Sequence, residues 1–108
     1  MKWGPLERGE LADSVHLREA LAQCKPAAVV HFSAFAYVGE SNANPTLHYQ
    51  NNVGGTLAPL EAMRECDFGK IVFSSSCAVY GAPDVVPISE ETPYAPINPY
   101  GATKMFCE

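Results

Sequence analysis

The first regular pattern of hydrophobic positions along the chain lies between residues 15 and 24. Apolar side chains recur there at the three- and four-residue spacing of one helical face, at Leu17, Ala20, Leu21 and Cys24. Asp13 or Ser14 can cap the first turn, and Lys25-Pro26 ends the segment. The pattern predicts an amphipathic helix.

Two short runs, residues 27–32 and 70–75, are apolar at nearly every position and rich in β-branched residues. Such runs are typical of parallel strands that are covered on both faces. The second run ends in Ser74-Ser75, and the first leads into Ser33. Because ligands of open α/β sheets bind beyond the carboxyl ends of the strands, these two polar strand ends predict a common crevice.

Helical periodicity returns from Asn44-Pro45 to Cys66, where Asn can cap and Pro suits the first helical position. Pro59 stands inside this pattern, where it would normally kink a helix. Residues 80–99 are rich in proline and predict an irregular loop, and Asn98-Pro99 opens a last helix from Tyr100. The alternation predicts an α/β fold: part of a Rossmann-like, doubly wound parallel sheet with crossover helices, in one partial domain over residues 1–108.

Composition narrows the function. Net charge is −5 with no cluster of Lys or Arg, which argues against a nucleic-acid or membrane partner. The four cysteines lack metal or redox spacing, so we expect reduced, partly buried thiols. The opening residues 1–8 carry charges instead of a long apolar stretch, so we expect no signal peptide, no membrane span and a cytoplasmic location.

Candidate chemistry gathers near the end of the chain. Tyr100 and Lys104 are four residues apart, which places a phenol and an ammonium on one face of the last helix. A nearby cation favours the phenolate form, which can accept a proton. Ser76 follows the second strand and can hydrogen-bond at the mouth of the crevice. Each signal alone also fits a solvated lysine or a polar turn, whereas together they indicate an acid/base site for alcohol oxidation.

The histidines have simpler interpretations. His31 lies in an apolar strand and is expected to be a hydrogen-bonded core residue, and His16 and His48 are expected on helix surfaces. No metal site is predicted.

A series of motifs resembles the UDP-glucose 4-epimerase group of the extended short-chain dehydrogenase/reductase family. The motifs are residues 30–34 (VHFSA), 38–41 (VGES), 51–56 (NNVGGT), 73–76 (FSSS) and 98–104 (NPYGATK), in the order and spacing of that group. The resemblance implies NAD as cofactor and a UDP-sugar as substrate. It implies that Tyr100 takes the proton of the sugar 4-hydroxyl while hydride leaves C4, that Ser76 hydrogen-bonds the same oxygen, and that Lys104 holds the nicotinamide ribose.

The resemblance also implies cofactor contacts at Phe32, Ser33, Ala34 and Ala36, at Asn51, and at Ser76, Tyr100 and Lys104. Glu10 and Leu11 stand where the family has an Asp and an apolar residue near the adenine. Ser76 and Tyr100 are the implied substrate contacts. Dimerisation through the long helix and the helix from Tyr100 is a further expectation from the family.

The sequence departs from the family in ways that leave alternatives open. No Gly-rich pyrophosphate loop precedes Val29, which predicts an internal fragment that is inactive alone. Ala36 stands where many galactose-pathway members have Lys, so a UDP-pentose epimerase is also open. A nucleotide-sugar 4,6-dehydratase usually has an acid where Cys77 and Ala78 stand. A catalytically dead fragment or scaffold, and a binding module for another ligand, are the alternatives outside enzymes.

Overall fold

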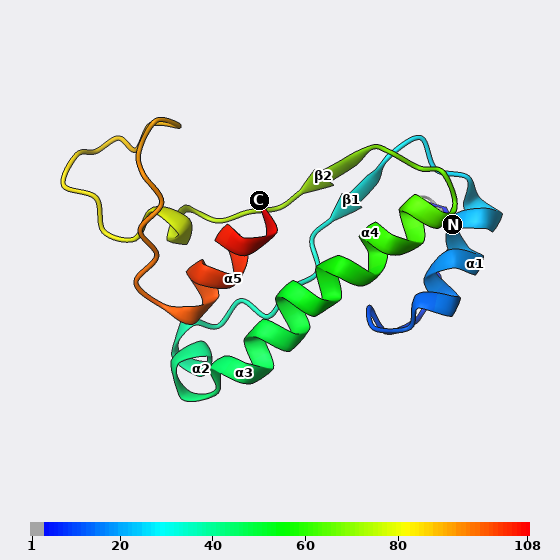
Figure 1. Cartoon of the computed structure of the whole chain (residues 1–108), viewed down its shortest axis with the longest axis horizontal. Helices are drawn as coiled ribbons and strands as arrows, with labels where there is room; N and C mark the ends of the chain where they lie inside the picture. Colours follow the sequence, from blue (N-terminus) through cyan, green and yellow to red (C-terminus); the bar gives the residue numbers. More distant parts are fainter. Residues whose placement is uncertain (1–3) are drawn as a thin grey trace.

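Two parallel strands and the helical segment between them form the centre of the molecule (Figure 1). The computed structural model describes residues 4–108, so residues 1–3 of the stretch that argued against a signal peptide lie outside it. Strands β1 (Val29–His31) and β2 (Ile71–Phe73) pair in register, Val29 with Ile71 and His31 with Phe73. The predicted parallel α/β arrangement is therefore present, with shorter strands than expected.

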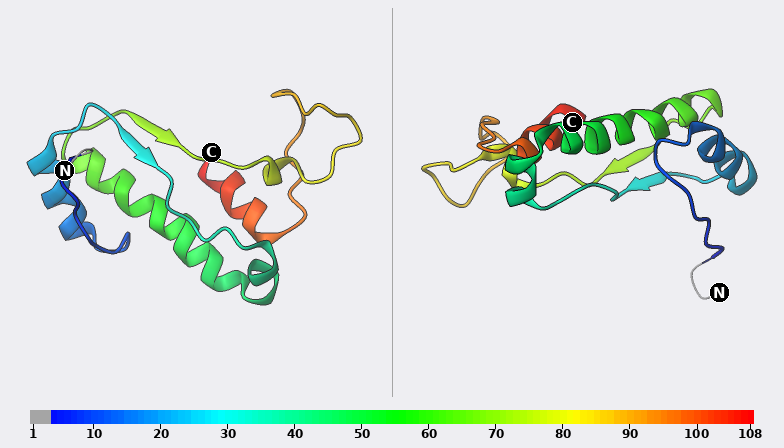
Figure 2. Two further views of the ribbon diagram at one scale, coloured as in Figure 1. Left: turned by 180° about the vertical axis from the view of Figure 1, so that it is seen from behind. Right: turned by 90° about the horizontal axis from the view of Figure 1, so that it is seen from below.

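The described residues cover the sheet unequally (Figure 2). The long helix lies over one face, whereas Val30 and Val72 remain 52% and 57% exposed. His31, their neighbour on the opposite face, is buried. The expectation that both faces of these strands are covered is wrong for the part of the chain that the structure describes, because alternate strand residues point to opposite faces and only one face meets a helix.

Helix α1 (Ser14–Cys24) confirms the first predicted helix. The Asp13 carboxylate accepts a hydrogen bond from the His16 backbone N–H at 3.0 Å, as an N-cap does. The helix packs along the last helical segment before β2, where Arg18 forms a 2.7 Å ion pair with Glu65. His16 is half-buried with its ring against Gly9, which corrects its expected surface position.

A continuous helical run connects the two strands. It consists of α3 (Pro45–His48), a π-helical segment η1 (Tyr49–Gly54) and α4 (Gly55–Glu65). Asn44 caps it as predicted, and α4 continues through Pro59. The π-helix and the short preceding helix α2 (Val38–Ala43) were not predicted. No helix within residues 4–108 is both long enough and apolar enough to cross a membrane.

After β2 the chain forms a short 3₁₀ turn η2 (Cys77–Tyr80), an irregular loop and α5 (Pro99–Cys107). The loop is closed at its base by a 2.9 Å hydrogen bond from the Ala95 N–H to the Val79 carbonyl. Gly81 lies opposite Ala95 with a φ of 66°, and a Cβ atom there would approach the Ala95 oxygen to 2.0 Å. Only glycine fits this turn.

The interior of the described chain is more polar than apolar. Its buried apolar side chains are Pro59, Ala62, Met63 and Val79, and its buried polar or charged ones are His31, Ser41, His48, Asn52, Thr56, Thr103 and Lys104. His48 was expected on a helix surface but is fully buried, with its ring edge toward Phe35. Buried polar groups are costly unless hydrogen-bonded, and among the described residues all of these except His48 make side-chain hydrogen bonds.

All four cysteines are free thiols. Cys66 and Cys107 are half-buried, in line with the prediction. Cys24 and Cys77 are exposed, so the expected partial burial is wrong for these two.

Candidate active site

The carboxyl ends of β1 and β2 lie side by side. The Ser74 N–H donates to the His31 carbonyl at 3.1 Å, directly beyond the last paired residues. The residues that follow the strands, beginning with Phe32 and Ser74, therefore leave the sheet at one edge. This is the edge where the sequence predicts a crevice.

Lys104 reaches this edge from α5. Its side chain is buried, and Nζ donates to the Ser74 carbonyl at 2.7 Å. Nζ also lies 4.9 Å from the centroid of the Phe73 ring, within cation–π range. Burial lowers the pKa of the Lys104 ammonium from its ordinary value. The strand thus holds this ammonium by a backbone carbonyl and a ring face.

The Phe73 ring also contacts His31, whose ring stacks on it at 5.8 Å between centroids. His31 Nε2 hydrogen-bonds the Thr56 hydroxyl at 3.0 Å. Burial, and secondarily the Lys104 charge, lower the pKa of His31. The hydrogen-bonded core role predicted for His31 is confirmed.

We expect Phe73→Leu to act on Lys104 through this ring. Leucine keeps the site apolar but removes the π face that stabilises the ammonium, so the pKa of Lys104 falls further below its ordinary value. If the reaction needs Lys104 in its charged form, the decline of the rate at alkaline pH should then begin at lower pH in the variant than in the parent protein. The check is a pH–rate profile of both proteins, with Phe73→Tyr restoring the parent profile. An unchanged limb in Phe73→Leu would contradict the role of the ring.

Tyr100 occupies the first turn of the same helix. Asn98 caps α5 by accepting from the Gly101 N–H at 2.8 Å, and Pro99 starts the helix. The half-buried Tyr100 donates its backbone N–H to the Ser41 hydroxyl at 3.3 Å. The cap therefore determines where the Tyr100 and Lys104 side chains begin, one helical turn apart.

Ser76 lies between the strand end and η2. Its hydroxyl accepts from the Ala78 N–H at 3.2 Å, capping the turn. It also lines a hollow of about 460 Å³, here called the Ser76 hollow. The lining residues of this hollow are Ser75, Ser76, Cys77, Val79, Tyr80, Ile88, Ser89, Glu90 and Glu108.

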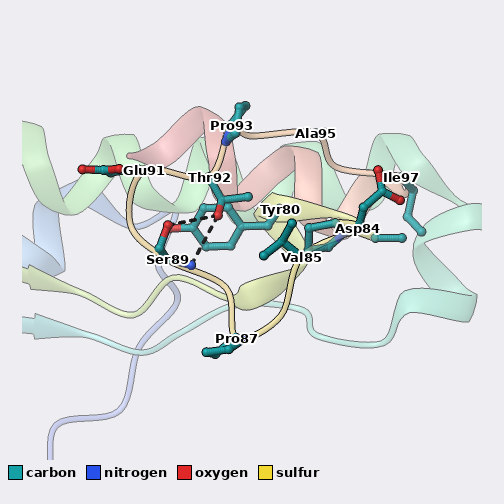
Figure 3. A pocket seen from close by; sticks show the side chains of 12 residues that line it. Tyr80, Asp84, Val85, Pro87, Ser89, Glu91, Thr92, Pro93, Ala95 and Ile97 are labelled. Atoms are coloured by element: carbon teal, nitrogen blue, oxygen red, sulfur yellow. Dashed lines mark hydrogen bonds between the residues drawn. The ribbon is translucent and has the colours of Figure 1, made fainter.

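A larger hollow of about 650 Å³ lies within the proline-rich loop (Figure 3). Tyr80 extends into the space that the loop encloses, and Ser89 and Thr92 hydrogen-bond across one end of it. Tyr80 and Ser89 line both this hollow and the Ser76 hollow. Neither lining includes Tyr100 or Lys104.

Gly101 permits α5 to lie against η2. A Cβ atom at this position would approach the Ala78 carbonyl oxygen to 2.5 Å and Pro96 Cβ to 3.1 Å. Tyr100 is the preceding residue, so this contact sets how closely its helix approaches the segment that carries Ser76. No feature of the neighbouring residues signals this requirement.

Gly101→Ala is therefore expected to destabilise the protein by about 1–3 kcal/mol, because backbone cannot yield as a flexible side chain would. Gly54→Ala is the matched control, since a Cβ there meets nothing within 4 Å. In a helix that change should stabilise by up to about 1 kcal/mol. Urea unfolding of both variants checks the opposite signs, and equal effects would refute the close-approach argument.

The residues expected to contact the cofactor lie on several segments, chiefly the loop after β1 and the π-helical segment η1. After β1, Phe32 is 75% exposed, Ser33 and Ala36 are exposed, and Ala34 is half-buried. Asn51 is half-buried in η1 and donates to the Asn52 side chain at 3.0 Å. Sequence reasoning passed over Asn52, although it belongs to the same NNVGGT motif; its burial and its bonds to distant segments were not visible locally.

Glu10 and Leu11 belong to the segment before α1, which lies beside the start of α4. Leu11 packs against Gly55, where an added Cβ would come within 3.1 Å of its side chain. Both residues line a small hollow of about 160 Å³ together with His16. The structure thus brings Ser76, Tyr100 and Lys104 onto adjoining segments and places Glu10 and Leu11 apart from them.

Comparisons with known proteins all find enzymes that act on nucleotide sugars. The family model described as GDP-mannose 4,6 dehydratase matches residues 4–108. UDP-glucose 4-epimerase of Rhizobium meliloti is 51% identical over the whole chain, which covers 33% of that protein, and UDP-arabinose 4-epimerase 1 of Arabidopsis thaliana is 43% identical over 92% of the chain, which covers 24% of that protein.

Among solved structures, UDP-glucose 4-epimerase from Brucella ovis in complex with NAD has a TM-score of 0.95 at 47% identity. The match covers 97% of this chain and 32% of that one. The chain spans about a third of the length of the UDP-glucose 4-epimerases of Rhizobium meliloti and Rhizobium leguminosarum bv. trifolii.

Proposed function

This chain belongs to the NAD-dependent epimerase/dehydratase family of extended short-chain dehydrogenases, and from that premise we propose that it carries the catalytic residues of a UDP-sugar 4-epimerase. The observation that supports the proposal most directly is the position of Lys104. It lies one helical turn after Tyr100, is buried, and donates to the Ser74 carbonyl at the end of β2. The 108 residues would form part of an NAD-binding domain.

The residues present fit NAD. The Lys104 ammonium has three N–H donors, and within residues 4–108 the structure records one acceptor for it, the Ser74 carbonyl. Two donors thus remain for ribose hydroxyls. The exposed Phe32 ring and the short side chains of Ser33 and Ala34 leave room for a flat ring system at the strand edge. Glu10 and Leu11 would hold the adenine end, and Ala36 and Asn51 the region between.

NAD, when bound, supplies a hydride acceptor that can return the hydride to the other face of the sugar. Tyr100 accepts the proton of the 4-hydroxyl as hydride leaves C4, and returns it when the carbon is reduced. Ser76 donates a hydrogen bond to the same oxygen, and the Lys104 charge favours the phenolate form of Tyr100. Proton and hydride both return, so only the configuration at C4 changes.

The test uses a restored protein, in which residues 1–108 replace the aligned third of the Rhizobium meliloti enzyme. The restored protein is expected to interconvert UDP-glucose and UDP-galactose, followed by NMR of the anomeric protons. The isolated chain, assayed in parallel, is expected to be inactive. If the restored protein binds NAD but epimerises no UDP-sugar, the proposed function is wrong.

The same assay addresses the sugar and the competing dehydratase reaction. A relative named UDP-arabinose 4-epimerase and the small Ala36 both support including UDP-xylose and UDP-arabinose as substrates. Cys77 and Ala78 carry no carboxyl group at the position where dehydratases usually have an acid. A 4-keto-6-deoxy product would identify a dehydratase instead.

A cytoplasmic location and a homodimer complete the proposal. The outer faces of the long helical run and α5 expose Leu57 (60%), Leu60 (38%) and Phe106 (64%). Tyr49 pairs with Phe106 across these two elements. An apolar surface shared by two helices suits a second copy of the same surface. Light scattering of the restored protein tests the dimer.

A further inference from the structure

One buried side-chain amide lies between α5, the helix that carries Tyr100 and Lys104, and the loop after β1. This loop, residues 32–37, holds four of the proposed NAD contacts and is called the cofactor loop below. Asn52 is 2% exposed in the π-helical segment η1. Amide side chains usually face water, because a buried donor or acceptor without a hydrogen bond is costly.

All the hydrogen-bonding capacity of this side chain is in fact used. Oδ1 accepts from the Phe35 backbone N–H at 2.8 Å and from the Asn51 side chain at 3.0 Å. Nδ2 donates to the Phe35 carbonyl and to the Thr103 hydroxyl, each at 3.0 Å. An amide offers two donor and two acceptor positions, and these four bonds occupy them all. These contacts are called the Asn52 network below.

The network binds two segments that are far apart in sequence. Phe35 lies in the loop after β1, between the proposed cofactor contacts Ala34 and Ala36, and both of its backbone polar groups bond to Asn52. Thr103 lies in α5 between Tyr100 and Lys104, and its fully buried hydroxyl also donates to the Tyr100 carbonyl at 2.7 Å. One side chain thus ties the cofactor loop to the catalytic helix.

We propose that Asn52 and Thr103 are positioning residues, which fix the loop after β1 relative to α5 and so align NAD with the sugar oxygen held by Tyr100. The inference rests on the proposed function and extends it to two residues that touch neither cofactor nor substrate. Hydride and proton must leave the same alcohol, so the distance between these two segments governs the rate. Two bonds to the backbone of one residue, on its N–H and on its carbonyl, hold it more rigidly than a single bond would.

Thr103→Val tests the helix side of the network in the restored protein. Valine keeps the volume but cannot accept from Asn52 or donate to Tyr100. We expect kcat for 4-epimerisation to fall roughly 10- to 100-fold, with KM for the UDP-sugar within about twofold. Thr103→Ser, which keeps the hydroxyl, should recover kcat to within about threefold of the parent.

Thr56→Val is the matched control. Thr56 is also buried, and its hydroxyl donates to the Asn52 backbone carbonyl at 2.6 Å and hydrogen-bonds His31 Nε2 at 3.0 Å, without contacting the Asn52 side chain. We expect it to lower stability, as loss of any buried hydrogen bond does, but to leave kcat within about twofold. An equal loss of kcat in Thr56→Val and Thr103→Val would overturn the proposal, since a general loss of packing would then explain both.

Asn52→Ala tests the loop side without relying on turnover. It frees both polar groups of Phe35, so we expect faster amide hydrogen exchange in residues 33–37 and an NAD Kd raised about tenfold, measured by calorimetry. If the parent restored protein binds NAD but epimerises nothing, the proposed function fails while this readout still judges the network. An unchanged Kd and unchanged exchange in Asn52→Ala would overturn the network itself.

Discussion

Replacement of Tyr100 by phenylalanine is expected to lower kcat of the restored protein about 1000-fold, while KM for the UDP-sugar changes by less than about threefold. The variant loses only the hydroxyl that would carry the proton of the sugar. The backbone bonds of residue 100 to Ser41 and Thr103 do not depend on that hydroxyl, so the helix should keep its place. NMR of the anomeric protons measures the rate, and NAD binding should persist.

Tyr49→Phe provides the control for this experiment. Tyr49 is 37% exposed on the outer side of the long helical run, beside Phe106. Loss of its hydroxyl should leave kcat unchanged. If Tyr100→Phe kept more than about a tenth of the parent kcat, another group would have to accept the proton, and the assignment of Tyr100 would be wrong.

Lys104→Met is expected to separate activity from stability. Methionine fills a similar volume without charge, so kcat should fall about 100-fold or more and the NAD Kd should rise, as donors to the ribose are lost. Within residues 4–108 the ammonium is buried without a carboxylate partner, held by the Ser74 carbonyl and the Phe73 ring. Removing its desolvation cost should leave stability equal to or above that of the parent.

The pH dependence of stability gives a second readout of Lys104. Burial lowers its pKa in the folded state, so between the folded and unfolded pKa values the unfolded chain binds more protons. Parent stability should therefore rise with pH across that interval, and Lys104→Met should lack this contribution. Lys70→Met, at an exposed lysine, is the control and should retain it. A Lys104→Met protein with parent activity would contradict the assigned role.

Elements with strong local signals could be predicted from the sequence. Asn98-Pro99 starts α5, and Asn44-Pro45 starts the long helical run, because cap and first-turn chemistry is contained in a few consecutive residues. The apolar runs predicted both strands. Tyr100 and Lys104 share a helix, so their spacing was enough to place them together.

Features that depend on distant partners were missed. Asn52 bonds to Phe35 and Thr103, which lie 17 and 51 positions away along the chain, and nothing in the residues next to Asn52 signals either contact. His48 resembles a surface histidine in a helical pattern, but tertiary packing buries it. The exposed face of the sheet was not predicted, because a short continuous apolar run has the same sequence pattern whether the described residues cover one of its faces or both.

The polar interior has a consequence for how stability varies with temperature. Exposure of apolar surface raises the heat capacity on unfolding, whereas exposure of polar surface lowers it. Among the described residues the buried set includes four apolar side chains, Pro59, Ala62, Met63 and Val79, against seven polar or charged ones. This segment should therefore contribute less than the usual increment of about 12–15 cal/mol/K per residue. The contribution of this segment to the free energy of unfolding should accordingly vary little with temperature. It should weaken little on cooling and depend mainly on the enthalpy of its hydrogen bonds.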